Sequence, residues 1–529
     1  LNLAGTIKKF GPEVPITCLT ATASVKVIED IQIEFDLESD DVSYHMDSSR
    51  EELTFRLQKP ENKAKYLKEI LQDRYASENL NNQSPFIIFC PLKNDNQVGN
   101  RLGVSGITDL ARESLPSLKI GSFTGDPHPK AWQPHLEFEA IGETSGKPKN
   151  YDTFKETVQR LFKANKLAGI VATKAFGMGV NKPNVRLTIH NGMPASMEAL
   201  YQEAGRAGRD QKPADCITIF TPEKRIPEKL HDANVDLEEL TKMFKEMTNG
   251  GDLNQQLYFL TSSNKTIETE LEECAIVLSS LREKGSEGLF ILNEENVSQG
   301  DGDVINTSRD RTKEKTIYRL KQLGYISDWT VENFKNGIYE VEWKDQNTEE
   351  VSDRIIKTIK KYTGTDANLE KLEIKIGAAI SRKDVVPEKG LMRVLLEWNY
   401  EHFVYNRRQS LKNLYEECEN FESPEKFKTK LESYFKSNQS FDALLNIIKL
   451  NAKDAVTPTI SLFLTPKGNL RSHNRIDKLS MTIARYLESY QNNPGLNLSS
   501  ALIRIWQEDF QNADGRPRLQ SFLEALGSY

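Results

Sequence analysis

Short apolar runs alternate with helically spaced apolar residues over the first part of the chain, to about Pro222. Between the first two runs, the spacing of Val25, Ile28, Ile31 and Phe35 predicts a helix. Continuous apolar runs separated by helical patterns predict a parallel α/β sheet with helices on both faces. The runs expected to form strands are 16–19, 86–90, 169–172, 186–189 and 216–220.

A stretch that contains Gly and Pro, from about Asp126 to Asn150, interrupts this pattern and predicts a surface insertion. His128 and His135 lie in it seven positions apart without a nearby cysteine. Zinc ligands normally come in larger Cys/His sets, so these histidines are predicted to be loop residues.

A different pattern occupies residues 263–345. The periodicity predicts helices near 267–281 and 309–323 with a short element near 294–299, and then a strand hairpin. Three helices followed by a hairpin are typical of a winged helix-turn-helix. The strand-like runs of the hairpin are 325–331 and 337–343.

The third helix of that module has one apolar and one basic face. Ile317, Leu320 and Leu323 form the apolar stripe. Such a basic face can replace counterions on DNA phosphates, whereas a solvated face and a protein-binding winged helix are the alternatives. The cations are Arg309, Arg311, Lys313, Lys315, Arg319 and Lys321.

Amphipathic helices with few strand signals fill residues 346–529, which are predicted to form an all-α C-terminal region that offers a surface for protein partners. Aromatic residues near Arg407 and Arg408 could stack on bases, but their helical offsets favour core packing. The clearest helical segments are 391–405, 411–421, 441–450 and 477–490.

Composition limits the class of protein. The 529 residues suggest several domains, and 38% hydrophobic and 28% charged residues indicate folded cores rather than a fibrous or disordered chain. The net charge of −7 excludes a uniformly basic nucleic-acid coat but allows basic patches. Because apolar runs are too short for a membrane span and five cysteines lie far apart, a reducing, cytoplasmic location without disulfides is expected.

The string 202–210 (Gln-Glu-Ala-Gly-Arg-Ala-Gly-Arg-Asp) carries the strongest chemical signal. Arg206 and Arg209 are three positions apart, so at a helix end they point the same way. The guanidinium fork binds phosphate oxygens and stays charged. An ordinary surface basic cluster is the alternative, and the length of the whole string disfavours it.

A second string, 172–183, follows a predicted strand, and ligands of α/β sheets collect at the carboxyl ends of strands. Gly177 and Gly179 let the backbone approach a phosphate or ribose closely, while Thr173 and Lys182 can bind oxyanions. The alternative for this string alone is a common strand-to-loop turn.

Four segments together resemble motifs III to VI of superfamily 2 helicases, and the last two are closest to the RecQ family of DNA helicases. The resemblance covers roughly the first 220 residues and implies RecA-like domains that clamp ATP and translocate 3′ to 5′ on single-stranded DNA. It implies that 1–41 ends a first RecA-like domain, 42–222 forms the second and 223–262 is a connector. The matching segments are 20–23, 86–90, 172–183 and 202–210.

The resemblance also implies roles for individual residues. Arg206 and Arg209 would be arginine fingers on the γ-phosphate, and Gln202 would sense that phosphate or the attacking water. Gly177, Gly179, Asn181 and Lys182 would contact the nucleotide, with Asn181 at the ribose. Thr173 would hold the DNA backbone, and Thr20 and Thr22 would couple hydrolysis to strand movement.

The chain departs from the family in three places. A Walker A loop and an Asp-Glu-x-His box are absent from the sequence, so the Lys and the Mg²⁺-organising acids are expected outside it and this chain alone is expected to be inactive. Residues 123–125 read Phe-Thr-Gly where the family often has Tyr-His-Ala-Gly, and the four-cysteine zinc site has no counterpart, so no metal is predicted.

Substrate and process stay open at this stage. A double-stranded DNA translocase, an RNA helicase on the same motor and a non-catalytic DNA-binding scaffold are the alternatives to a helicase acting on single-stranded and forked DNA. Repair, recombination and defence against foreign DNA are all compatible with the motifs.

Overall fold

The structure is a computed structural model. Thr20, Thr22, Gly179, Arg309 and Arg311, and the element expected near 294–299, lie outside the residues that it describes. Those residues are 16–19, 31, 35, 50–77, 81–95, 102–125, 133–143, 150–177, 181–231, 235, 237–247, 250–262, 266–292, 312–333, 338–363, 366–382, 386–435, 444, 447–448, 450–464, 470, 476, 479–480, 482–484, 486–487 and 493–511.

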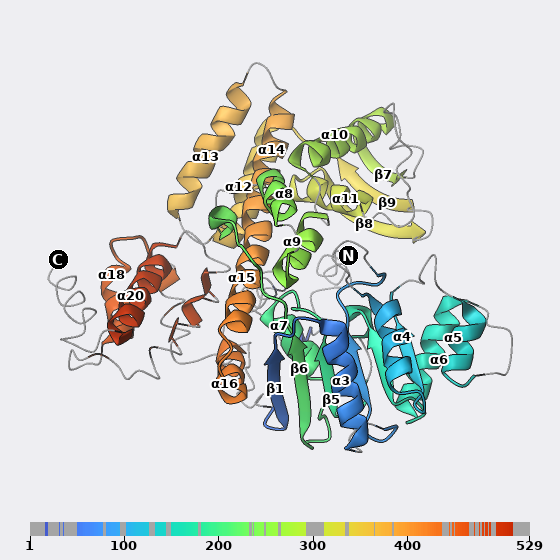
Figure 1. Cartoon of the computed structure of the whole chain (residues 1–529). Coiled ribbons are helices and arrows are strands. Elements are labelled where there is room, and N and C mark those ends of the chain that lie inside the picture. The colour runs from blue at the N-terminus through green and yellow to red at the C-terminus, as the bar shows by residue number, and fades with distance from the viewer. Residues whose placement is uncertain are drawn as a thin grey trace.

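A six-stranded sheet in the order β1-β6-β5-β2-β4-β3 forms the first module (Figure 1). All neighbouring strands pair in parallel, which confirms the predicted parallel α/β sheet. The four strand-like runs from Phe86 onward coincide with β2, β4, β5 and β6. The strands are β1 (Leu53–Gln58), β2 (Phe86–Phe89), β3 (Ile120–Phe123), β4 (Gly169–Ala172), β5 (Leu187–His190) and β6 (Ala214–Ile219).

Helices cover both faces of this sheet, as parallel strands buried on two sides require. One face packs on α3 (Lys63–Ala76) and α4 (Val104–Ser114), and the other on α6 (Tyr151–Lys163) and α7 (Met197–Ala204). Asn62 caps α3 and Asn150 caps α6, each by accepting a backbone N–H with its side-chain oxygen.

One expectation for the first module is wrong. Residues 16–19, expected to be a strand, have no regular secondary structure, and Leu19 is 91% exposed. A strand must pair with a neighbour, and no described residue pairs with this segment. The insertion at 126–150 contains a helix, α5 (Pro134–Ala140), tied to α4 by the Arg112–Glu137 ion pair at 3.0 Å.

The second module contains α10 (Ile267–Lys284), α11 (Thr312–Gln322) and a three-stranded antiparallel sheet in the order β7-β9-β8. Its strands are β7 (Glu287–Leu292), β8 (Ile326–Asn333) and β9 (Ile338–Lys344). The hairpin β8–β9 was predicted, whereas β7 was not. The predicted apolar stripe is confirmed, because Ile317, Leu320 and Leu323 are all buried against this sheet and α10.

The segment expected to be a connector holds a 3₁₀ turn (Glu228–His231), α8 (Leu237–Glu246) and α9 (Asp252–Ser262). It packs against the first sheet rather than hanging between modules, since Leu240, Leu253 and Leu257 belong to the same buried cluster as Phe55. Asp252 fixes the start of α9, because its carboxylate accepts the backbone N–H groups of Met193 and Thr221.

The residues expected to form one C-terminal helical region are divided among three buried clusters. Helices α12, α13 and α14 belong to the core that contains α10 and α11. Helices α15 and α16 belong to the core of the six-stranded sheet. Helices α18 and α20 form a third core. A π-helical turn (Tyr400–Val404) links α14 to α15 (Figure 1). The helices are α12 (Thr348–Thr363), α13 (Asp366–Ser381), α14 (Pro387–Asn399), α15 (Tyr405–Glu419), α16 (Pro424–Phe435), α18 (Val456–Phe463) and α20 (Pro494–Gln511).

Candidate functional site

The site begins at the end of α7. Ser196 caps this helix by accepting the N–H of Ala199 at 3.1 Å, and the helix ends at Gly205, so that Arg206 and Arg209 stand in the turn that follows. Gly208 adopts a left-handed conformation with φ of +62°, which favours glycine. A Cβ at this position would lie 2.7 Å from the Glu52 side chain, so the glycine also allows a close approach to the chain before β1.

Backbone and side-chain contacts fix this turn from three directions. Arg50 donates to the carbonyl oxygens of Gly205 at 3.0 Å and Ala207 at 2.6 Å. The Gly208 N–H donates to the carbonyl of Val185 at 2.9 Å, and Asp210 is ion-paired with Arg186. The turn is therefore held in place before any ligand binds, which lowers the cost of ordering its two cations.

Arg209 and Asn181 meet in this site. The Arg209 Nη1 donates to the Asn181 Oδ1 at 3.1 Å, which joins the two sequence motifs, and both side chains are exposed. Gln202 is exposed one turn earlier on α7. The structure thus brings Arg209 and Asn181 together.

Arg206 sits deeper than Arg209. Its Nε is buried and has no hydrogen-bond partner among the described residues. Burial lowers the pKa of Arg206, and the positive charge of Arg209 acts in the same direction, whereas Glu203 opposes both. The guanidinium stays charged at physiological pH because its ordinary pKa is so high. A buried cationic donor without a partner fits an anionic ligand oxygen.

Lys182 departs from the expectation that it binds an oxyanion. The residue is 3% exposed, and its ammonium contacts Asn165 and the carbonyl of Lys163 and lies 5.6 Å from the centre of the Phe162 ring. Burial lowers the pKa of Lys182. The ammonium is therefore part of the packing between α6 and the chain before β5.

Thr173 lies at the opposite edge of the sheet. It follows the carboxyl end of β4, while the turn 205–210 and Asn181 precede the amino ends of β6 and β5. The backbone N–H of Thr173 donates to the Phe123 carbonyl at 3.1 Å, and the residue starts the 3₁₀ turn (Lys174–Gly177). The predicted residues therefore form two groups, one at the carboxyl ends of the strands and one at the amino ends. The described part of the segment that follows Thr173 ends at Gly177.

Two polar residues of this region were missed by sequence analysis. Arg50 stands alone before β1, and no pattern marks it as an anchor of the turn 205–210. His190, at the end of β5, is buried with its Nε2 3.1 Å from the Glu203 Oε2 and its ring stacked on Phe89. His190 is distant from the string 202–210 in the sequence. Only the fold, which places it against Glu203 of that string, identifies it.

The basic face predicted on α11 is smaller than expected. Arg319 is turned inward and pairs with Glu270 at 3.1 Å, with both side chains largely buried, so this cation is neutralised rather than presented to DNA. Lys321 lies 5.2 Å from the centre of the Trp329 ring, and Lys315 is exposed. Among the described cations of α11, Lys315 and Lys321 remain as candidates for phosphate contact.

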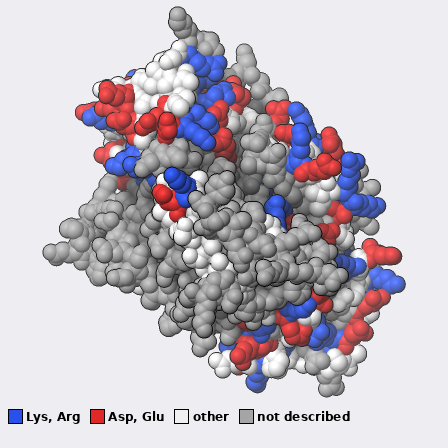
Figure 2. Space-filling view, turned by 90° about the vertical axis from the view of Figure 1, so that its left-hand side faces the viewer, with Lys and Arg blue, Asp and Glu red and all other residues white. Residues whose placement is uncertain are grey.

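The outer face of the β7-β9-β8 sheet has the opposite charge. Strand register places Leu289 beside Glu342 and Ile291 beside Glu340, and Asp328 is the next partner of Glu342. Carboxylates repel phosphates, so DNA that approaches this module would meet α11 rather than the sheet face. On the face shown in Figure 2, the Lys/Arg and Asp/Glu side chains of the described residues lie interspersed.

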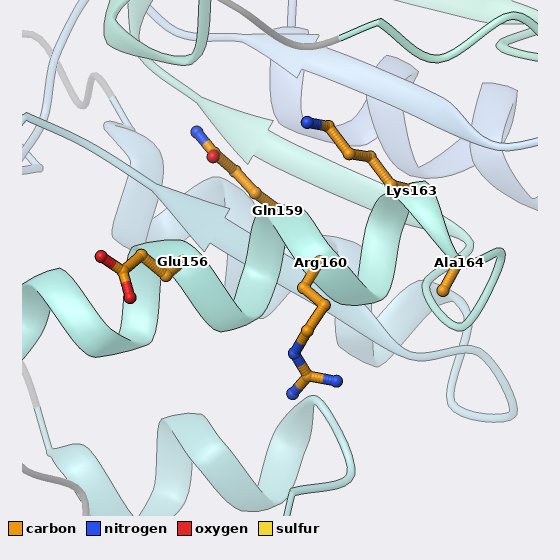
Figure 3. A pocket seen from close by; sticks show the side chains of 5 residues that line it. All are labelled: Glu156, Gln159, Arg160, Lys163 and Ala164. Atoms are coloured by element: carbon orange, nitrogen blue, oxygen red, sulfur yellow. The ribbon is translucent and has the colours of Figure 1, made fainter.

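A hollow of about 590 Å³ lies along α6 (Figure 3). All five side chains that line it come from one helix and its end, and Arg160 extends away from Gln159 and Lys163. Binding sites normally collect polar groups from several elements, so we assign this hollow no role. Its lining residues are Glu156, Gln159, Arg160, Lys163 and Ala164.

Comparisons with known proteins agree with this geometry. Residues 149–211, which contain both motifs, match the helicase conserved C-terminal domain. ATP-dependent DNA helicase Q1 of Pongo abelii is 32% identical over 220 residues, which are 41% of this chain and 28% of that protein. ATP-dependent DNA helicase RecQ of Bacillus subtilis is 29% identical over 208 residues, 39% of this chain and 28% of that protein.

Among solved structures, the chain is similar to Mss116p DEAD-box helicase domain 2 bound to an RNA duplex. The match covers 44% of this chain and 76% of that structure, with 14% sequence identity and a TM-score of 0.24. The segment that matches the helicase conserved C-terminal domain includes strands β4 and β5 of the parallel sheet and the turn after α7. The relatives to which the chain is similar are ATP-dependent DNA helicases named Q1 and RecQ. The matched segment spans 28% of the length of the first two relatives.

Within the described residues, every helix is too short or too polar to cross a lipid bilayer.

Proposed function

We propose that this chain supplies the second motor domain and the DNA-engaging part of an ATP-dependent helicase that unwinds DNA from 3′ to 5′. The single observation that carries the proposal is the turn after α7, where Arg206 has a buried donor without a partner among the described residues and Arg209 is held by Asn181. The family match over the same residues supports the same role.

ATP fits the charge and donor set of this turn. Arg206 and Arg209 would contact the terminal phosphate, and Asn181 would lie at the ribose. ATP, bound with Mg²⁺, would supply the phosphoryl group whose hydrolysis drives movement. The two guanidinium groups would stabilise negative charge on that group, an effect worth about a thousandfold or more in rate for an arginine finger.

DNA would be held in two places. Thr173 and the 3₁₀ turn after β4 lie at the carboxyl edge of the sheet, where α/β proteins bind ligands, and would contact the single strand. The module of α10, α11 and the small sheet would act as a winged helix that meets the duplex through Lys315 and Lys321 on α11. The acidic outer face of its sheet favours this orientation.

The test is ATP hydrolysis and strand separation by the full-length protein, with forked DNA and forked RNA as substrates. We expect DNA-stimulated ATPase activity that Arg209→Ala lowers by about a thousandfold, as for other arginine fingers. Arg160→Ala is the matched control, since it removes an exposed arginine that pairs with Glu143 at 2.9 Å. Equal ATPase rates in Arg209→Ala and the parent would contradict the finger assignment.

The remaining candidates give different results in the same assay. Unwinding of RNA but not of DNA would favour an RNA helicase, and ATPase stimulated by duplex DNA without strand separation would favour a translocase. DNA binding without any ATPase activity would favour the scaffold. We prefer the DNA helicase because the two relatives identified by sequence, from Pongo abelii and Bacillus subtilis, are DNA helicases.

A further inference from the structure

A helix from the far end of the chain contacts the helix that carries the arginine turn. Tyr434 on α16 donates its hydroxyl to the Glu198 Oε1 at 2.7 Å, across 236 positions of sequence. Glu198 lies in the first turn of α7 and Tyr434 is 4% exposed. A hydrogen bond from a hydroxyl to a carboxylate is stronger than one between neutral groups, and burial protects it from water.

A second contact links the same two helices through β1. The Phe427 ring on α16 lies 6.2 Å from the Phe55 ring, and Phe55 is stacked on Tyr201 of α7 at 6.5 Å and 14°. These rings lie within one buried cluster that also contains Leu200. The start and the middle of α7 therefore both depend on α16, which lies beside the edge strand β1 (Figure 1).

The direction of α7 sets the position of the arginine turn. The helix is only eight residues long and rigid, so a change of direction at its first turn moves its end, where Gly205 begins the turn. Arg50 holds the carbonyl groups of the turn, at the opposite end of the helix from Glu198. A displacement of about 1 Å in a catalytic group can lower a rate by about a hundredfold.

We propose that α16 positions the arginine turn and that Tyr434 is a positioning residue for ATP hydrolysis, acting through Glu198 on Arg206 and Arg209. This inference rests on the proposed ATPase function. It gives α16, which follows the second module in the sequence, a role at the proposed ATPase site. No helicase motif was identified in the sequence of α16.

The experiment uses the full-length protein with Tyr434→Phe, Glu198→Gln and the double variant. Tyr434→Phe keeps the buried ring and removes only the hydroxyl. We expect the kcat of DNA-stimulated ATP hydrolysis to fall five- to tenfold, with the KM for ATP nearly unchanged and a modest fall in the Tm from the lost hydrogen bond. The double variant is expected to be no slower than the slower single variant, because both substitutions weaken one contact.

Tyr75→Phe is the matched control. Tyr75 shares a hydrogen bond of 2.8 Å with Ser117, far along the chain from α7, so its removal should leave kcat unchanged. An unchanged kcat in Tyr434→Phe, or kcat losses that multiply in the double variant, would overturn the proposal. A purely structural role would instead lower the Tm and the active fraction without a specific loss of kcat.

Hydrogen exchange gives a readout that does not need activity. In the Tyr434→Phe variant, the amides of residues 205–210 should exchange faster than in the parent, and in Tyr75→Phe they should not. A parent without ATPase activity would contradict the proposed function, while faster exchange would still support the contact between α16 and the turn. Unchanged exchange at 205–210 would overturn the positioning role in either case.

Discussion

The Arg209 guanidinium donates to the Asn181 side chain at 3.1 Å, so the two strings singled out in the sequence meet in one place in the fold. This hydrogen bond joins exposed side chains and contributes little to folding. Its value lies in orientation, because it limits the positions that the guanidinium can occupy before a phosphate arrives.

Asn181→Ala is therefore expected to lower DNA-stimulated ATP hydrolysis by about tenfold or more while changing the free energy of unfolding by less than about 0.5 kcal/mol. Steady-state kinetics and denaturant unfolding of the full-length protein measure the two effects. Asn62→Ala is the contrasting control, because loss of the α3 cap should cost about 1 kcal/mol without altering the rate per folded molecule. A wild-type rate in Asn181→Ala would show that Arg209 is oriented by other contacts.

Asp252→Asn is expected to destabilise the first module by about 2–4 kcal/mol. The carboxylate is nearly buried, and it accepts the Lys63 ammonium at 2.6 Å as well as two backbone N–H groups. The NH₂ group of an asparagine side chain would face one of these N–H donors and could not accept from it. The Lys63 ammonium would also lose its counter-charge. Urea unfolding measures the loss.

The control for that substitution is Asp152→Asn, which weakens a pair with Lys155 in which Asp152 is 79% exposed. Exposed pairs contribute about 0–1 kcal/mol, so the two losses should differ clearly. Equal losses would mean that the contacts of Asp252 add nothing beyond those of a surface pair.

Lys315→Glu is expected to weaken binding to forked DNA and to reduce the slope of log K against log salt by about one. The reason is that one phosphate contact, with its released counterion, is lost. Fluorescence anisotropy at several salt concentrations measures both quantities. Lys344→Glu makes the same charge change on β9, beside Glu287 on the acidic sheet face, and should leave the slope unaltered. A slope changed equally by both substitutions would argue that the effect is one of overall charge.

The cysteines predict an alkaline limit to stability. All five are free, and four are buried. Burial raises the pKa of Cys216 from 9.0 to about 12, so in the native state this thiol stays protonated where it would ionise in the unfolded chain. The unfolded state then holds fewer protons, and the free energy of unfolding should fall as the pH rises above about 9.

Thiol labelling checks the same burial. In the Cys18→Ser variant, which lacks the exposed thiol, a thiol-specific reagent should react with no cysteine of the native protein at pH 9 and with four after denaturation. Rapid labelling of a native thiol in that variant would show that one of the buried cysteines is accessible to the reagent.

The sequence predicted the parallel sheet because its inner strands are buried on both faces and read as continuous apolar runs. β4 (Gly169–Ala172) coincides with its predicted run. The edge strand β1 was missed because Leu53, Phe55 and Leu57 alternate with polar residues, a pattern that a single pass for continuous runs does not detect. β7 exposes Leu289 and Ile291, so its pattern lacks a clear buried face.

Site residues were harder to predict than strands, since a sequence does not give the direction of a long charged side chain. Lys182 and Arg319 were expected to face ligands, yet each meets a partner that lies on another element, Asn165 and Glu270 respectively. Lysine and arginine bury their aliphatic stems readily, and the location of a counter-charge depends on tertiary packing. Arg206 and Arg209 stand just after the end of α7, which agrees with the helix end predicted from the string 202–210.

The packing of α15 and α16 against the six-stranded sheet has a consequence for synthesis on the ribosome. Phe55 and Leu200 belong to a core that Tyr415, Phe427 and Leu431 complete, and those residues are translated only after the whole second module. While the nascent chain grows, β1 leaves an open edge and an apolar face without a cover, and such surfaces attract chaperones or aggregate.

A transcript with a premature stop codon before residue 405 would therefore yield a first module with an incomplete core, which cellular proteases degrade readily. Shortened versions of this protein would be degraded rather than accumulate. The order of translation thus links the survival of the first module to the production of the intact C-terminal helices.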